Sequence, residues 1–176
     1  MSSKLRAIAI IVFVIILDRV TKLYIQSRVS ELDLYPVIPR FFNIIHTENP
    51  GAAFGFLAGS AAAWRPLVLV GVSIIVMIVI ASMLWQPEKH GATSALMQTG
   101  LALVFGGAAG NLWDRAIRGS VTDFLQFFFG SYEFPSFNAA DSAIFCGACL
   151  LLIDMWMNRK GTEARGQGPA AEVIHS

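Results

Sequence analysis

Apolar residues in this chain gather in long runs that are separated by shorter polar or aromatic segments. A helix needs about 20 apolar residues to cross a bilayer, at a rise of about 1.5 Å per residue. Four stretches meet this length: 5–25, 66–85, 94–113 and 139–157. No small-residue cleavage site follows the first stretch, which favours a retained span over a signal peptide. The pattern therefore predicts an all-α membrane protein with four transmembrane helices.

Two connecting segments, 26–65 and 114–138, are long enough to hold structure of their own, and they share one side of the membrane. In the first, "RFFNIIHTENPGAAFGF" predicts a β-hairpin that turns at "NPG", because glycine accepts the positive φ of a type II turn. In the second, the alternation over 120–129 predicts a strand with Asp123 among its apolar positions. Aromatic residues crowd both segments, as is typical of a membrane–water interface.

The charges at the ends of the spans bear on orientation. An even number of spans puts both termini on one side, and basic residues at positions 4, 6, 159 and 160 favour the cytoplasm for both. Residues 1–158 are expected to form one membrane-embedded domain, and residues 159–176 a polar cytoplasmic tail. In the third span, Gly106 and Gly110 predict close packing against another helix.

The composition agrees with a membrane protein and excludes other classes. Of the 176 residues, 55% are hydrophobic and 14% are charged, whereas soluble domains carry about 25% charged residues. The net charge of +1 and the lack of basic runs give no case for nucleic-acid binding. Cys146 and Cys149 share one side of the fourth span and are expected to be buried packing residues, because a metal site needs more ligands.

Two carboxylates stand in apolar surroundings, where a charge is costly. Asp141 lies at the start of the fourth span in "FNAADSA", where either it or Asn138 suits the N-cap of the helix. Asp123 lies in "GSVTDF" and, taken alone, is compatible with a strand residue at the membrane interface. Each acid therefore has a structural interpretation and a catalytic one.

As a pair, the two acids favour catalysis, because both fall on the outer side beside the end of a span. Two ionised carboxylates about 4.5 Å apart would repel each other by about 4 kcal/mol at an effective dielectric of about 20. One acid would then hold a proton near neutral pH while the other is ionised. Such a dyad deprotonates water for attack on a carbonyl and protonates the leaving nitrogen, without a cofactor or a metal.

Other chemistries find less support in the sequence. The three histidines, His46, His90 and His175, fall in separate parts of the chain and cannot form a zinc site together. Ser142 lacks the G-x-S-x-G context of a nucleophile. Two acids could hold Mg²⁺, but sites for this ion recruit further oxygen ligands and phosphates.

Further polar residues gather towards the outer side. The motif "GNLWDR" places Asn111, Asp114 and Arg115 at the end of the third span, where Asp114 also suits a simple ion pair with a neighbouring cation. Asp18 and Lys22 lie four residues apart on one helix face, which predicts an ion pair between them.

Five motifs together resemble those of the lipoprotein signal peptidases, the bacterial type II signal peptidases. "LDRVTK", "ENPGAAFG", "GNLWDR", "GSVTDF" and "FNAADSA" occur in the order of that family and at roughly its spacing, within residues 5–157. The resemblance implies an aspartyl endopeptidase of the bacterial inner membrane, with four helices, cytoplasmic termini and a small β-cradle facing the periplasm. Its substrate would be a diacylglyceryl-modified prolipoprotein, cleaved just before the lipidated cysteine, and its inhibitor would be globomycin.

The resemblance also implies roles for individual residues. Asp123 of "VTDF" and Asp141 of "NAADS" match the catalytic dyad. The other matches are the polar residues that line the site and the supporting acids, namely Asn49, Asn111, Arg115 and Asn138, with Asp18 and Asp114. The proline of "ENPG" is not accounted for by the family pattern, but it puts no catalytic residue in doubt.

Two other functions remain open from the residues alone. A small proton- or ion-coupled carrier would also use intramembrane acids, but this chain is short, lacks an inverted repeat and has both acids near the surface. A non-catalytic membrane scaffold would need only the helix packing of "GGAAG". All three functions share membrane lipids as partners.

Overall fold

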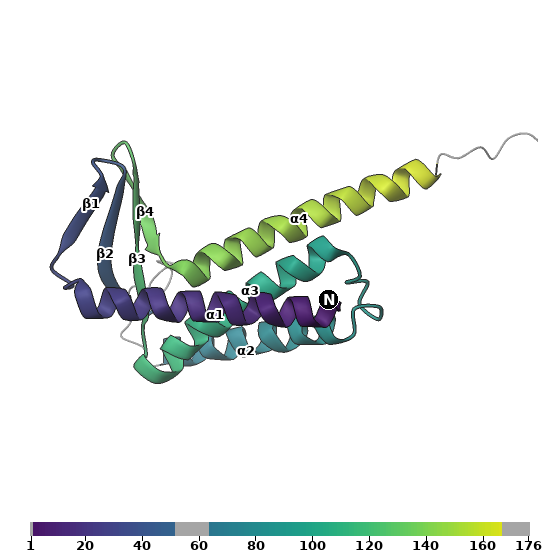
Figure 1. Cartoon of the computed structure of the whole chain (residues 1–176), viewed down its shortest axis with the longest axis horizontal. Helices are drawn as coiled ribbons and strands as arrows, with labels where there is room; N and C mark the ends of the chain where they lie inside the picture. The colour runs from purple at the N-terminus through teal and green to yellow at the C-terminus, as the bar shows by residue number, and fades with distance from the viewer. Residues whose placement is uncertain (1, 52–63, 167–176) are drawn as a thin grey trace, which may run out of the picture.

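The computed structural model describes residues 2–51 and 64–166, which form helices at one end and an antiparallel sheet at the other (Figure 1). In chain order the elements are α1 (Ser3–Arg28), β1 (Leu34–Ile38), β2 (Phe42–Asn49), α2 (Trp64–Trp85), α3 (Ala95–Arg118), β3 (Val121–Phe129), β4 (Tyr132–Phe137) and α4 (Ala139–Gly166). The N-terminus lies at the end of the molecule opposite the sheet.

Helix α3 is the centre of the helical part, because it packs against α1, α2 and α4. A core cluster joins α1, α2 and α3 through small and branched apolar side chains: Ala7, Ile80, Leu84, Leu101 and Ala102. Large apolar side chains on α1, α2 and α4 nevertheless remain exposed in the isolated chain. Exposed apolar faces of this extent are typical of helices that contact lipid.

Three of the described helices contain a segment long and apolar enough to cross a membrane: Leu67–Trp85, Ala95–Arg118 and Ala139–Asn158. Helix α1 is as long, with 26 residues, but charged side chains interrupt its apolar run. Two of them, Asp18 and Lys22, are completely buried inside the protein. These two charges are therefore turned inward, while apolar side chains of the same region, such as Leu17 and Val20, face outward.

The glycines of "GGAAG" bring α3 close to α1, which confirms the predicted packing role. A Cβ atom on Gly106 would lie 2.9 Å from the Cβ of Val14, and one on Gly110 would lie 2.5 Å from Oδ2 of Asp18. Neither distance leaves room for a methyl group. The absence of side chains at these two positions thus sets the distance between α1 and α3 beside the acid Asp18.

Two helices run further than the apolar pattern predicts. Helix α3 ends at Arg118, where Gly119 adopts a left-handed conformation (φ 76°) and its N–H bonds to the carbonyl of Arg115. The helix thus extends beyond residue 113, the predicted end of the span, and Asp114 and Arg115 belong to it. Helix α4 continues to Gly166, into the segment predicted as a polar tail, because bilayer length limits only the apolar part of a helix.

The four strands form one antiparallel sheet in the order β1-β2-β3-β4. The strand predicted over 120–129 is confirmed as β3, whereas β1 and β4 were not predicted. Both of these edge strands contain a proline, at positions 36 and 135. Proline in a sequence argues against a strand, because it lacks an N–H group for the ladder, but it is tolerated in an edge strand, which has a partner on one side only. The first run of the predicted hairpin is β2; its second run lies outside the described residues.

Pairing of β2 with β3 brings polar residues of two distant motifs together. Thr47 is opposite Asp123 and Asn49 is opposite Val121, after a register shift that follows Ile44. Stacked rings of Phe42, Phe127 and Phe137 stabilise the far part of the sheet. The polar residues at the end of β2 and at the start of β3 lie on the side of the sheet nearest the helices.

The predicted burial of the two cysteines is wrong for Cys146, which is exposed, while Cys149 is partly exposed; both are free thiols. The error has a physical reason. In a soluble protein an apolar helix face packs against protein, but in a membrane it contacts lipid, so apolar character does not indicate burial within the chain.

Candidate active site

Asp141 lies in the first turn of α4, and its neighbour Asn138 caps that helix. Oδ1 of Asn138 accepts a hydrogen bond from the N–H of Asp141 (3.0 Å), and Oδ2 of Asp141 accepts one from the N–H of Asn138 (3.2 Å). This reciprocal pair is a capping box. Of the two N-cap candidates in the sequence, Asn138 is the cap, and Asp141 keeps its second oxygen for Nδ2 of Asn111 at 2.7 Å.

Asp123 lies on β3 and is 2% exposed. Its Oδ2 accepts a hydrogen bond from Nδ2 of Asn49 (2.9 Å), and its Oδ1 accepts one from Nδ2 of Asn138 (2.8 Å). Burial raises the pKa of Asp123 to about 6, and the negative charge of Asp141 also raises it, against the two amide hydrogen bonds and Lys22. Asp123 therefore loses its proton far less readily than an ordinary aspartate.

The two acids predicted as a pair are joined by Asn138, although they come from a strand and a helix. Asn138 donates its side-chain N–H to Asp123 and its backbone N–H to Asp141. Nδ2 of Asn138 also approaches Oδ1 of Asn111 at 3.3 Å, and Asn111 in turn donates to Asp141. Two carboxylates thus share a shell of amide donors.

A buried ionic cluster lies behind this pair, between α1 and α3. Nζ of Lys22 contacts Oδ2 of Asp18 at 2.8 Å and Oδ2 of Asp114 at 2.7 Å, and all three side chains are fully buried. Arg19 forms a second ion pair with Asp114. The predicted Asp18–Lys22 pair is confirmed, and so is a cation partner for Asp114. Oδ1 of Asp18 also accepts the N–H of Ala140 (3.1 Å), which ties α1 to the start of α4.

Arg115, near the end of α3, is a cation whose charge acts on both of the paired acids. Its side chain interacts electrostatically with Asp141, Asp123 and Asp114. Its Nε atom is buried, and no side chain or backbone group in the described part of the chain accepts a hydrogen bond from it. A donor of this kind has bonding capacity to offer to a bound molecule.

Sequence reasoning missed Glu48, which joins the polar ends of β2 and β3. Its Oε2 accepts a hydrogen bond from Oγ of Ser120 (2.5 Å), and its Oε1 accepts one from Oγ1 of Thr122 (2.8 Å). Burial acts to raise the pKa of Glu48, but these bonds, with those of His46 and the charge of Arg118, lower it below its usual value. Its position next to Asn49 in the motif "ENPG" is the sequence feature that could have indicated a role near the site.

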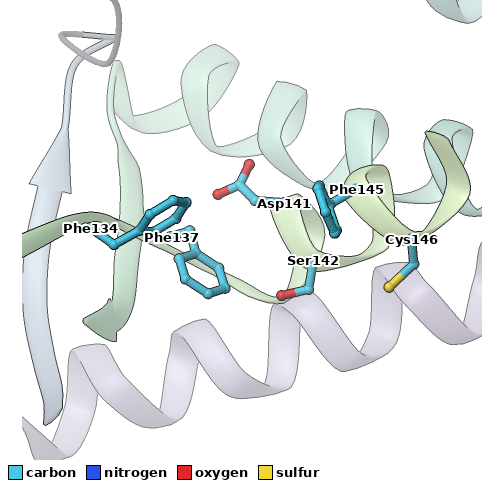
Figure 2. Close-up of a pocket in the computed structure, with 6 residues that line it drawn as sticks. All are labelled: Phe134, Phe137, Asp141, Ser142, Phe145 and Cys146. Carbon is cyan, nitrogen blue, oxygen red and sulfur yellow. The ribbon is translucent and has the colours of Figure 1, made fainter. Parts of the chain in front are cut away.

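An apolar cavity of about 400 Å³ opens beside Asp141. Its walls come from β4 and α4: Phe134, Phe137, Asp141, Ser142, Phe145 and Cys146. Figure 2 shows the Asp141 carboxyl group between the rings of Phe134 and Phe137 on one side and the ring of Phe145 on the other. In the segments that the structure describes, no group of three or more His, Cys, Asp or Glu side chains is arranged to hold a metal ion.

The titration of Asp123 leads to a prediction about stability. Its pKa of about 6 in the folded protein lies above the ordinary value of 3.8, so ionisation of Asp123 opposes folding. This loss of stability is absent below about pH 4 and complete above about pH 7, where it amounts to about 3 kcal/mol. Asp123→Asn removes the titration, so its melting temperature in detergent should rise relative to wild type as pH increases from 4 to 7.

The exposed acid Asp33 supplies the control for this measurement. Asp33→Asn removes a carboxylate from the same end of the molecule, but from a site open to solvent. Its melting curve should follow that of wild type at each pH. Parallel curves for Asp123→Asn and wild type across this range would contradict the prediction.

Comparison with known proteins identifies relatives that cover most of the chain. The family model described as signal peptidase (SPase) II matches residues 10–157. The lipoprotein signal peptidase of Solibacter usitatus is 46% identical over 150 residues, which make up 85% of this chain and 90% of that protein. The lipoprotein signal peptidase of Bacillus pumilus is 41% identical over 155 residues, 88% of this chain and 95% of that protein.

A solved structure supports the same relationship. A bacterial membrane enzyme determined by the in meso method aligns with a TM-score of 0.75 at 32% identity, covering 96% of this chain and 94% of that one. Helices with a small antiparallel sheet at one end are therefore an architecture that this chain shares with a membrane enzyme. The chain belongs to the signal peptidase II family, whose members are proteases that remove signal peptides from prolipoproteins.

Proposed function

We propose that this protein is an aspartyl endopeptidase that removes the signal peptide from diacylglyceryl-modified prolipoproteins by cleaving before the lipidated cysteine. The observation that carries the proposal is the pair Asp123 and Asp141, held by a common set of amide donors next to an apolar cavity. Membership of the signal peptidase II family supplies the substrate class.

In this mechanism Asp123 and Asp141 share one proton. The ionised carboxylate takes a proton from water as the water oxygen bonds to the scissile carbonyl carbon. The protonated carboxyl group gives its proton to the leaving nitrogen as the carbon–nitrogen bond breaks. The dyad again holds one proton at the end, now on the other acid, and the products are a carboxylic acid and an amine. No cofactor or metal takes part in this scheme.

The polar neighbours of the dyad bind and orient the peptide. Arg115, whose buried Nε has no partner among the described residues, is suited to donate a hydrogen bond to a peptide carbonyl and to stabilise the negative charge that develops on its oxygen. Asn49, Asn111 and Asn138 hold the two carboxyl groups and bind backbone polar groups of the substrate. Asp18 and Asp114 support this arrangement through Lys22. Positioning of this kind accounts for a large part of the rate in many enzymes.

The apolar cavity beside Asp141 receives apolar atoms of the substrate next to the scissile bond. Its three phenylalanine rings come from the edge strand β4 and from the lipid-exposed side of α4. A substrate whose lipid and signal helix lie in the bilayer can reach such a cavity from the side. Globomycin is expected to inhibit by occupying the same space.

We propose that α1 also crosses the bacterial inner membrane, so that it and the three apolar helices α2, α3 and α4 make four spans. The ionic side chains inside the apolar part of α1, Asp18, Arg19 and Lys22, are buried or paired, which removes the main cost of placing this helix in a bilayer. Residues 1–158 then form a single peptidase domain with the sheet and the dyad at the periplasmic face. Both termini, including residues 159–176, are on the cytoplasmic side.

A cleavage assay tests the proposed function. Purified protein in detergent is incubated with diacylglyceryl-modified prolipoprotein in the presence of a metal chelator. We expect cleavage before the lipidated cysteine, inhibition by globomycin, and no cleavage of the same precursor without its lipid. Ion flux in reconstituted vesicles, combined with no cleavage, would instead favour a carrier and overturn the proposal.

A further inference from the structure

Three asparagines surround the two acids, and each has its side-chain oxygen bonded to a group that can only donate. Oδ1 of Asn49 accepts the N–H of Gly51 (2.9 Å), and Oδ1 of Asn138 accepts the N–H of Asp141 (3.0 Å). Oδ1 of Asn111 accepts the ammonium group of Lys22 at 2.9 Å. Because the oxygen is held in each case, the NH₂ group must face the acid.

The donor on Asn111 differs from the other two, because it belongs to a side chain far away in the sequence. The other two donors are backbone groups within three residues of their asparagine. Lys22 is on α1 and Asn111 is on α3, 89 residues apart, and the bond between them is fully buried. The orientation of the Asn111 amide therefore depends on the packing of two helices.

The geometry points to Lys22 as a positioning residue for catalysis: its ammonium group fixes the Asn111 amide so that Nδ2 donates to Asp141. This inference rests on the proposed function, in which Asp141 is one of the two catalytic acids. It goes beyond the neutralising role that Lys22 has in the ion pairs with Asp18 and Asp114.

The consequence of losing Lys22 follows from the shape of an amide group. Without the ammonium, Oδ1 of Asn111 keeps only the longer contact from Nδ2 of Asn138 (3.3 Å), a donor that also serves Asp123 at 2.8 Å. The Asn111 amide can then turn over and present its oxygen to Asp141 instead of its NH₂ group. An amide oxygen repels an ionised carboxylate and accepts a hydrogen bond only from a protonated one. The turned amide would therefore hold the shared proton on Asp141 and disturb its transfer.

Neutralisation alone does not require this contact. Arg19 also pairs with Asp114, but no hydrogen bond joins it to Asn111 among the described contacts. It lies over the Trp113 ring, with its guanidinium carbon 6.0 Å from the ring centroid. Arg19 and Lys22 thus neutralise the same acid, and only Lys22 orients an amide of the active site.

Single removal of Lys22 would leave two buried carboxylates with one cation, so the test uses a charge-balanced variant. Asp18→Asn with Lys22→Met keeps the Arg19–Asp114 pair and removes one charge of each sign. Its reference is Asp18→Asn alone, which keeps the ammonium group beside Asn111. Cleavage of lipid-modified prolipoprotein should show kcat reduced about 100-fold by Lys22→Met on this background, with KM changed less than about threefold.

A double-mutant cycle separates positioning from a purely structural role. On the Asp18→Asn background, Asn111→Ala should itself reduce kcat about 100-fold. Adding it to Lys22→Met should cost less than about a further threefold, because the two residues act through one hydrogen bond. On the same Asp18→Asn background, where it leaves Asp114 paired with Lys22, Arg19→Gln should keep kcat within about threefold of Asp18→Asn alone.

Two results would overturn the inference. One is equal kcat with and without Lys22 on the Asp18→Asn background; the other is a reduction by Asn111→Ala that multiplies in full with that of Lys22→Met. The proposed function fails separately, if Asp123→Asn and Asp141→Asn process prolipoprotein at the wild-type rate. Inactivity of those two variants, together with no effect of Lys22, would reject the positioning role alone.

Discussion

Asp141→Asn should abolish cleavage of lipid-modified prolipoprotein, and Asp123→Asn should have the same effect. Each variant leaves one carboxyl group, whereas the proposed scheme needs an ionised base for water and, beside it, a second, protonated acid for the leaving nitrogen. Loss of general acid–base catalysis typically costs about 10²–10⁴-fold, and kcat should fall towards the upper end of this range because each variant also loses the shared proton. Precursor and product are measured on gels after incubation in detergent.

The amide replacement suits this test because it preserves most of the local bonding. At position 141 an asparagine can still accept the N–H of Asn138 and continue the capping box. A cooperative melting transition at or above the wild-type temperature would show that each variant folds. The loss of activity can then be assigned to chemistry.

Asp154 provides a matched control on the same helix. It is 6% exposed and accepts hydrogen bonds from Ser94 and from Asn158 (2.9 Å for the latter), near the middle of α4 and several turns from Asp141. Asp154→Asn therefore removes a buried acid from α4 without touching the dyad, and it should keep kcat within about threefold of wild type. Substantial cleavage by either dyad variant would refute the two-carboxylate mechanism.

Asn138→Ala should have the second largest effect, because it affects both acids at once. It removes the donor to Asp123 and the acceptor that caps α4. We expect kcat to fall about 100-fold, since the two acids lose their common anchor. Loss of the cap should also cost about 1 kcal/mol of stability. Activity and melting temperature are measured on the same preparation.

Asn138→Asp separates these two contributions. Aspartate is as good an N-cap as asparagine, so the melting temperature should recover relative to Asn138→Ala. Its carboxylate cannot donate to Asp123 and places a further negative charge beside it, which should raise the pKa of Asp123 above about 6. The variant should therefore fold well and cleave poorly. Wild-type activity in Asn138→Asp would show that the donor to Asp123 is dispensable.

Much of the helical architecture follows from local properties of the chain. A bilayer requires about 20 apolar residues per helix, so the runs over 66–85, 94–113 and 139–157 predict helices whatever their partners. The alternation over 120–129 likewise predicts β3. The cap at the start of α4 belongs to the same class, because Asn138 and Asp141 bond within a single turn.

The limits of the sequence lie where an element depends on neighbours that are distant along the chain. The strands β1 and β4 are short and contain proline, so only their pairing with β2 and β3 makes them strands. The exposure of Cys146 likewise depends on which face of α4 packs against protein. Glu48 accepts its hydrogen bonds from Ser120 and Thr122, which are more than 70 residues away in the sequence and come beside it only when β2 pairs with β3.

The sequence by itself determined which residues carry polar chemistry in an apolar chain, including the two acids, three asparagines and Arg115 that the motifs single out. The tertiary structure alone decided how they are bonded: Asn138 joins Asp123 to Asp141, and Lys22 reaches Asn111 across 89 residues. The physical reason is that a hydrogen bond depends on the direction of a donor in space. A motif specifies the donor, and helix packing supplies its direction.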